Sequence, residues 1–236
     1  MQFDTLLSQR YSCRGFLPQP VERATIERIL GLAQKTPSWC NAQPWHITIS
    51  SGAAADAFRD AMLKASDTLP PQPDFPWPVE YTGLYQARRR ACGFGLYDSV
   101  GVQRGDRAAS ARQARENFRL FGAPHVAIVT TEAALGVYGA VDCGAYVSNF
   151  MLAARSLGVA SIAQRRSPPG RAWCASASAC RRAASWCAAS RSASRIRPTR
   201  RTASAPGARR SAKWFPGAIR ACWYATGGAR GLKCAL

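Results

Sequence analysis

The pattern of apolar and polar positions predicts five helices and three strands in the first 164 residues. Helices are expected over residues 2–9, 20–37, 56–69, 104–121 and 141–159, the last apolar almost all round and closed by Gly158 as its C-terminal cap. Strands are expected over residues 44–50, 123–131 and 158–164. Five Pro between residues 68 and 81 indicate an extended loop or lid. Helices and strands alternate without a clean βαβ repeat, which favours an α+β layered fold.

Charge divides the chain at Gln164. The protein has 236 residues and a formal net charge of +19. Residues 1–164 hold 16 Lys and Arg against all 13 Asp and Glu, so their net charge is +3. Residues 165–236 hold the other 16 basic residues, no acidic residue and no Val, which is too little aliphatic surface to offset the entropy of folding. We therefore expect residues 165–236 to be an Arg-, Ala- and Ser-rich disordered tail.

Cysteine usage and hydropathy favour a cytoplasmic protein. The N-terminus lacks the basic start and long apolar run of a signal peptide, and no stretch of about 18 apolar residues predicts a membrane span. The nine Cys are then expected to be free thiols in a reducing compartment. No pair of Cys has zinc-site spacing joined to a second pair or to either His (His46 and His125), so no metal site is expected.

Two polar clusters are candidates for ligand binding. In "RYSCRGF", Arg10, Ser12 and Arg14 can hold a phosphate by charge-assisted hydrogen bonds, although the same residues also suit a solvated basic turn. In "TPSWCNAQPWHI", a hydroxyl and two amides beside two Trp suit a flat heteroaromatic ring, although an ordinary Pro-bounded loop leading into a strand has the same composition. The residues alone leave both alternatives open. A third stretch, "DCGAYVSNFMLAARSLGVAS", reads alone as a core helix whose Gly144 and Ala145 would permit close packing.

In this order, the three stretches resemble the nitroreductase family of FMN-dependent oxidoreductases over residues 3–164. "RYSCRGF" is similar to the family's R-R-S-x-R-x-F, "PSWCNAQPW" to its P-S-x-x-N-x-Q-P-W, and the third stretch to its D-x-G-x-x-x-x-N-x-x-L-A-A-x-x-L-G. Residues 101–125 resemble the branch that includes nitrobenzoate reductases. The resemblance implies a layered α+β fold with a central, mostly antiparallel sheet flanked by helices, in an intertwined homodimer.

The resemblance also implies the site residues and the chemistry. Arg10, Tyr11, Ser12 and Arg14 would hold the FMN phosphate and ribityl chain, with Tyr11 replacing the family's usual Arg or His. Ser38, Asn41 and Gln43 would reach the flavin ring from the second subunit, and Asn117 is a weaker candidate for the ring's polar edge. The flavin would pass a hydride from NAD(P)H to a nitroaromatic or quinone in ping-pong fashion, so no side chain need act as a catalytic acid or base.

The family's C-terminal pattern is missing after Gln164. If one base was lost just after the Gln164 codon, back-translation restores that pattern, in order, across the tail. We therefore divide the chain into a nitroreductase-like FMN-binding domain, residues 1–164, which is C-terminally incomplete, and an out-of-frame tail, residues 165–236.

Two alternatives to an active enzyme follow from the tail. One is an inactive, frameshifted nitroreductase. The other is a nucleic-acid-binding protein whose Arg-rich tail, interleaved with Trp, contacts phosphates and bases. The frameshift explains the tail's composition without a partner, so nucleic acid is not expected as a ligand. Membrane binding is not expected either.

Overall fold

Two helical layers enclose a small sheet in the computed structural model, which describes residues 1–71, 73–164, 190–191 and 221–224. The α-helices are α1 (Phe3–Gln9), α2 (Arg23–Ala33), α3 (Ala53–Thr68), α4 (Gly83–Ser99), α5 (Arg107–Arg115) and α6 (Gly136–Ser156). Short 3₁₀ helices are η1 (Trp39–Asn41), η2 (Leu120–Gly122) and η3 (Ala133–Leu135). The strands are β1 (His46–Ser51), β2 (His125–Thr130), β3 (Val159–Ala160), β4 (Ser190–Arg191) and β5 (Ala221–Tyr224).

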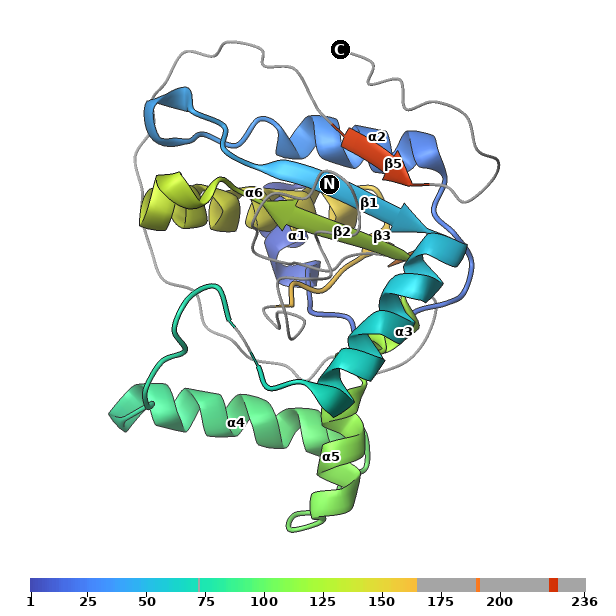
Figure 1. Ribbon diagram of the computed structural model, residues 1–236, viewed down its shortest axis with the longest axis vertical. Coiled ribbons are helices and arrows are strands. Elements are labelled where there is room, and N and C mark those ends of the chain that lie inside the picture. Colours follow the sequence, from blue (N-terminus) through green and yellow to red (C-terminus); the bar gives the residue numbers. More distant parts are fainter. Residues whose placement is uncertain (72, 165–189, 192–220, 225–236) are drawn as a thin grey trace.

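The main sheet has the strand order β2-β1-β5 (Figure 1). β1 and β2 pair antiparallel, with Ile47 opposite Val129 and Ile49 opposite Ala127. β5 pairs parallel with β1, and β3 pairs antiparallel with β4. The expected α+β fold with a mostly antiparallel sheet is thus confirmed.

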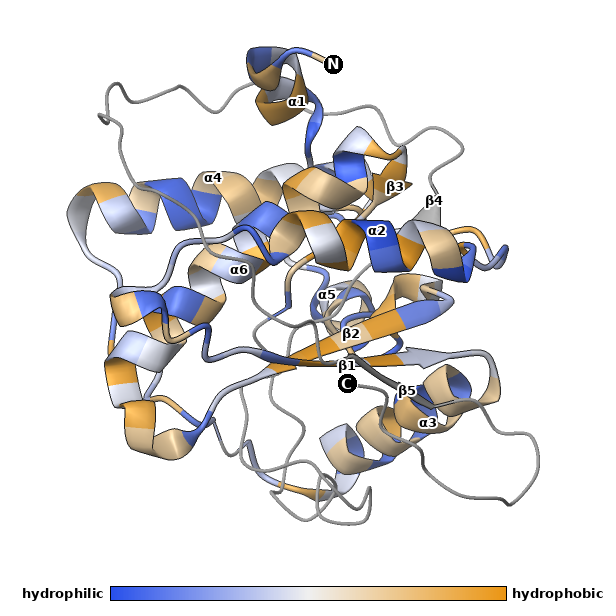
Figure 2. Ribbon diagram, turned by 90° about the horizontal axis from the view of Figure 1, so that it is seen from above, coloured by the Kyte–Doolittle hydropathy of each residue, from blue (hydrophilic) through white to orange (hydrophobic). Residues whose placement is uncertain are grey.

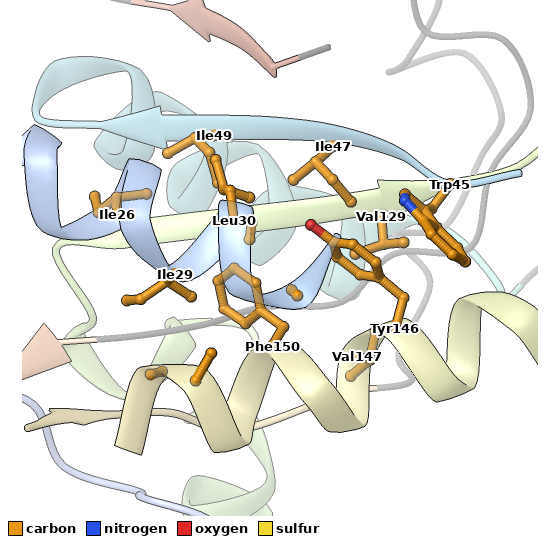
Figure 3. Close-up of a cluster of buried hydrophobic side chains, with 14 of the residues drawn as sticks. Ile26, Ile29, Leu30, Trp45, Ile47, Ile49, Val129, Tyr146, Val147 and Phe150 are labelled. Carbon is orange, nitrogen blue, oxygen red and sulfur yellow. The ribbon is translucent and has the colours of Figure 1, made fainter. Parts of the chain in front are cut away.

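Each face of the sheet has its own core because side chains alternate along a strand. α2 and α6 lie on one side of β1 and β2 and α3 on the other (Figure 2). On the α2–α6 side, Ile47, Ile49, Ala127 and Val129 join one buried cluster, whose side chains interlock in Figure 3. On the α3 side, Val126 and Ile128 pack with α3 instead, in a cluster that includes Phe58. The strand rich in β-branched residues that was expected over 123–131 is buried for this reason.

Several boundaries differ from the sequence-based expectation. α5 ends at Arg115 rather than residue 121, since Leu120 and Phe121 adopt positive φ angles of 56° and 52°, which a right-handed helix cannot contain. α6 begins five residues before the expected start and is followed by Gly158 with φ +76°, the C-terminal glycine that was predicted. α4 was not predicted at all. None of its residues is buried, so no periodic apolar stripe marks it in the sequence.

The tail is described only at the short strands β4 and β5. The rest of the expectation for residues 165–236 lies outside the described residues.

Candidate functional site

The first cluster lies in the extended segment that follows α1. Ser12 forms a parallel β-bridge with Ser161, and the Cys13 N–H donates to the Ser161 carbonyl at 3.1 Å. Side chains alternate along an extended chain, and Cys13 points into the core with 6% exposure. Arg10, Ser12 and Arg14 therefore share the opposite side, where Ser12 is exposed and both Arg side chains are half-buried. Two guanidiniums and a hydroxyl so placed fit a phosphate.

Tyr11 alternates with these three residues and is 41% exposed. Its phenol is accessible, but the alternation places it on the Cys13 side of the segment. Arg10, Ser12 and Arg14 thus share one side of the segment, and Tyr11 lies on the other.

The second cluster is a loop with an unusual backbone. Cys40, Asn41 and Gln43 have positive φ angles of 50°, 54° and 47°. Residues other than glycine rarely adopt this region. Each one costs about 1–3 kcal/mol and persists only where the surrounding structure holds it in place. Here the Gln43 N–H donates to Ser38 Oγ at 2.8 Å, which closes the loop across five residues. The Ser38 hydroxyl hydrogen is left available for a ligand.

A chain of amide hydrogen bonds holds the same loop from the side. The Trp45 indole Nε1–H donates to Gln34 Oε1 at 3.0 Å, and Gln34 Nε2 donates to Gln43 Oε1 at 2.8 Å. Gln43 Nε2 donates in turn to Asn41 Oδ1 at 2.8 Å. Gln34 was missed in the sequence because a single polar residue at the end of α2 carries no signal.

α6 anchors this loop through one face of the helix, at spacings of four and three residues. Asp142 accepts hydrogen bonds from the Trp39 N–H at 3.3 Å and 3.2 Å. Tyr146 packs against Trp45 with ring centroids 4.9 Å apart, and Asn149 Nδ2 donates to Thr36 Oγ1 at 2.8 Å. The motif that reads as a core helix is thus also the support of the loop.

The two clusters attach to opposite ends of α6. Asp142 holds the loop near one end, and Arg155 Nη2 donates to Gln9 Oε1 at 3.0 Å, just before residues 10–14, the candidate phosphate-binding stretch that we call the phosphate segment. These two anchors are 13 residues apart in sequence (155 − 142), which is about 20 Å along the helix axis. The Arg155 Nε is buried without a partner in the described part of the chain.

Asn117 lies apart from both clusters. It follows α5, and its Nδ2 donates to the Ala114 carbonyl at 2.9 Å. Within residues 1–71 and 73–164, no hydrogen bond connects it with the loop or with the phosphate segment.

Burial shifts the pKa values of three side chains in the described chain towards their neutral forms. Burial is the main cause that raises the pKa of the Cys143 thiol to about 11, so this thiol stays protonated at neutral pH. Burial likewise raises the pKa of Tyr146 and lowers that of His125. No three His, Cys, Asp or Glu side chains gather as metal ligands among the described residues. The helices in that part of the chain are all too short or too polar to cross a membrane.

Comparison with known proteins agrees with this arrangement. The family model described as "Nitroreductase family" matches residues 7–168. The chain belongs to the nitroreductase family. The match spans both clusters and the α6 motif, so the resemblance inferred from the motifs is confirmed.

Relatives also place the chain near the nitrobenzoate-reductase branch of the nitroreductases. "Nitroreductase NfnB" of Mycolicibacterium smegmatis is 34% identical over 166 residues, which covers 68% of this chain and 69% of the relative. A "4-nitrobenzoate reductase" of Nocardioides sp. is 33% identical over 69% of this chain and 68% of the relative. A second 4-nitrobenzoate reductase, of Pseudomonas putida, is 32% identical and covers 69% of this chain and 71% of the relative.

Solved nitroreductase structures share the fold. The FMN-dependent nitroreductase NfnB from Mycobacterium smegmatis, solved in complex with NADPH, superposes with a TM-score of 0.73 at 31% identity and covers 79% of this chain and 85% of its own. The FMN and NADPH-dependent NfnB from Sphigopyxis sp. strain HMH gives a TM-score of 0.74 at 29% identity and covers 80% of this chain and 86% of its own.

Proposed function

We propose that this protein is an FMN-dependent oxidoreductase that uses NAD(P)H to reduce nitroaromatic or quinone-like acceptors. The observation that carries the proposal is the loop at residues 38–43, whose unusual backbone is fixed by the nitroreductase motif of α6. Relatives that are FMN-dependent and act with NADPH support the choice of cofactor and electron donor. Relatives that are nitrobenzoate, nitrobenzene and chloronitrobenzene reductases support the class of acceptor.

The donors of both clusters fit FMN. Arg10, Ser12 and Arg14 supply positive charge and a hydroxyl for the phosphate, and the exposed Tyr11 between them is proposed to reach the phosphate or ribityl chain as well. Asn41 Nδ2 makes no hydrogen bond to another described residue, so a polar edge of the flavin ring can accept one from it. The Ser38 hydroxyl donates to no other residue that the structure describes, and Gln43 positions Asn41.

Held by the two clusters, FMN would supply hydride transfer between NAD(P)H and the acceptor. The protein binds and orients the flavin, and the aromatic Trp39, 64% exposed beside Asn41, offers an apolar surface for a flat ring. Cys143 is a neutral, buried thiol and takes no part. No side chain is required as an acid or base.

We further propose that the working unit is a homodimer. The α6 residues that anchor the two clusters in one chain lie about 20 Å apart along the helix axis, which favours a site that takes its loop from one subunit and its phosphate segment from the other. α6 also exposes Val137, Tyr138 and Val141 at 70%, 63% and 65%. Tyr138 contacts Trp39 with ring centroids 5.4 Å apart, so this apolar face lies beside the loop.

Asn117 is kept as the weakest candidate for the flavin's polar edge. One Nδ2 hydrogen is already donated to the Ala114 carbonyl, so fewer of its amide hydrogens are available to a ligand than at Asn41. We expect Asn117→Ala to change FMN affinity less than Asn41→Ala does.

Titration of the purified 236-residue chain with FMN, followed by quenching of flavin fluorescence, tests the proposal. We expect saturable binding, NAD(P)H oxidation with 4-nitrobenzoate, and loss of at least about tenfold in FMN affinity for Arg10→Ala and Arg14→Ala. Arg28→Ala is the matched control, because it removes the same charge from the exposed side of α2. Equal losses in all three variants would contradict a phosphate site at residues 10–14.

We also propose that residues 165–236 are the out-of-frame product of a nitroreductase gene, and that the protein is cytoplasmic. Support for the first comes from the acid-free composition of the tail and from the family match, which ends at residue 168. Support for the second comes from the free cysteines that a reducing compartment maintains. A sequencing read without a shift after the Gln164 codon would contradict a sequencing error, and cell fractionation tests the location.

A further inference from the structure

We infer that Gln34 is a positioning residue that fixes which end of the Asn41 amide faces the ligand. The inference rests on the proposed function, in which Asn41 contacts the flavin. It concerns the direction of the three hydrogen bonds that join Trp45, Gln34, Gln43 and Asn41, which we call the amide relay.

The relay has a direction because it begins at a group that can only donate. An indole N–H carries one hydrogen and accepts nothing, so the partner of Trp45 must be an acceptor. Gln34 therefore turns its Oε1 towards Trp45, which leaves its Nε2 towards Gln43. Gln43 must then present its Oε1 to Gln34 and its Nε2 to Asn41.

The relay ends at the exposed Asn41 and determines the orientation of its side-chain amide. Asn41 uses its Oδ1 to accept from Gln43, so its Nδ2 is the atom that faces outward. A side-chain amide is nearly symmetric in shape, and either end fits the same space. The relay removes that ambiguity and presents a donor to the ligand.

The relay is rigid where it starts and strained where it ends. Trp45 is 6% exposed and packs on Tyr146, while the backbone N–H of Gln34 donates to the Leu30 carbonyl at 2.8 Å in the last turn of α2. Asn41 and Gln43, in contrast, lie in the loop with positive φ angles of 54° and 47°. The fixed core thus determines the orientation of a side chain in the loop.

Gln34→Glu tests the direction, because a carboxylate has the same shape as the amide and only accepts. The introduced carboxylate still accepts from Trp45 but cannot donate to Gln43, so Gln43 turns its Nε2 towards the carboxylate and its Oε1 towards Asn41. Asn41 must then turn its Nδ2 inward and its Oδ1 outward. We expect FMN affinity to fall about tenfold or more, as a donor to the flavin becomes an acceptor.

Gln34→Met separates positioning from stability. Methionine fills the same space but leaves the Trp45 indole N–H without its acceptor, so this variant should unfold at lower urea concentration than Gln34→Glu does. It does not force Asn41 to turn. We therefore expect opposite orders: the Met variant is the less stable, and the Glu variant binds FMN more weakly. If FMN affinity follows stability instead, Gln34 is only structural and the inference is wrong.

The negative charge that Gln34→Glu adds needs its own control. Lys35→Gln makes the same change in net charge at the neighbouring position outside the relay. Titration of each variant with FMN at low salt and at about 0.5 M NaCl screens a purely electrostatic loss and leaves an orientation effect in place. Loss of affinity in Lys35→Gln equal to that in Gln34→Glu would overturn the inference.

A measurement without FMN distinguishes failure of the relay from failure of the proposed function. In the wild-type chain, the side-chain NH₂ of Asn41 should exchange quickly with water, because nothing in the described structure accepts from it. In Gln34→Glu the same NH₂ should become protected, as seen in ¹⁵N NMR spectra. Unchanged exchange overturns the relay. Protection that appears in Gln34→Glu, beside a wild-type chain that binds no FMN, supports the relay and overturns only the flavin proposal.

Discussion

Asp142→Ala should release the loop that carries Ser38 and Asn41. The Asp142 carboxylate is 9% exposed and accepts from the Trp39 N–H at 3.3 Å and 3.2 Å. A hydrogen bond to a charged group contributes about 1.5–3 kcal/mol, and these long distances place this one at the lower end, about 1.5 kcal/mol. We expect the free energy of unfolding to fall by about that amount.

Asp142→Asn is the matched variant, because its Oδ1 can still accept from Trp39. It should lose about half as much stability, since a neutral acceptor is weaker than a carboxylate. Urea unfolding followed by Trp fluorescence measures both, with FMN titration beside it. FMN affinity should fall further in the Ala variant than in the Asn variant, because three residues with positive φ angles lose one of their constraints. The anchoring argument is refuted if Asp142→Ala matches the wild type in stability and FMN affinity.

Three further predictions concern pH, packing and assembly. His125 Nε2 accepts a hydrogen bond from the Val21 N–H at 2.7 Å, and burial lowers the pKa of His125 below 6.5. As pH falls, the unfolded chain therefore binds a proton at His125 before the folded chain does, and stability should fall below about pH 6.5. Urea unfolding near pH 8 and near pH 5.5 measures this, and a flat profile would contradict it. Gly139→Ala should lower the free energy of unfolding in urea by about 1–2 kcal/mol, because a Cβ there would lie 2.8 Å from Thr131 Oγ1. Gly144→Ala in the same helix, where a Cβ would have nothing within 4 Å, should be neutral or stabilising in the single chain. The reverse order would contradict the packing of α6. Gly144→Leu should shift the proposed homodimer towards monomer in sedimentation, and an unchanged dimer would place the interface elsewhere.

Much of the fold could be predicted because apolar periodicity dominates it. β2 reads as a buried strand rich in β-branched residues and is buried on both faces, and α2 places its predicted apolar residues Ile26, Ile29, Leu30 and Ala33 in the core. α4 escaped prediction since an exposed helix has no core-facing stripe. The parallel pairing of β5 with β1 joins segments about 170 residues apart, and no local signal in the sequence specifies it.

The residues of the candidate site could be named from the sequence, but the residues and backbone angles that hold them in place could not. Ser38, Asn41 and Gln43 were identified by their motif, and the structure brings them together by hydrogen bonds. Gln34 was not identified, because its role depends on the position of Trp45 across the loop. The positive φ angles could not be foreseen either, as Cys and Gln seldom adopt them.

An FMN titration of two purified proteins tests whether this chain descends from an FMN-dependent oxidoreductase. One is the 236-residue chain, and the other is the same chain with the reading frame restored after Gln164. We predict that the restored protein is yellow, binds FMN tightly and oxidises NAD(P)H with 4-nitrobenzoate, and that the 236-residue chain binds FMN more weakly at the same loop and phosphate segment. A restored protein that folds but remains colourless and takes up no FMN would contradict the account.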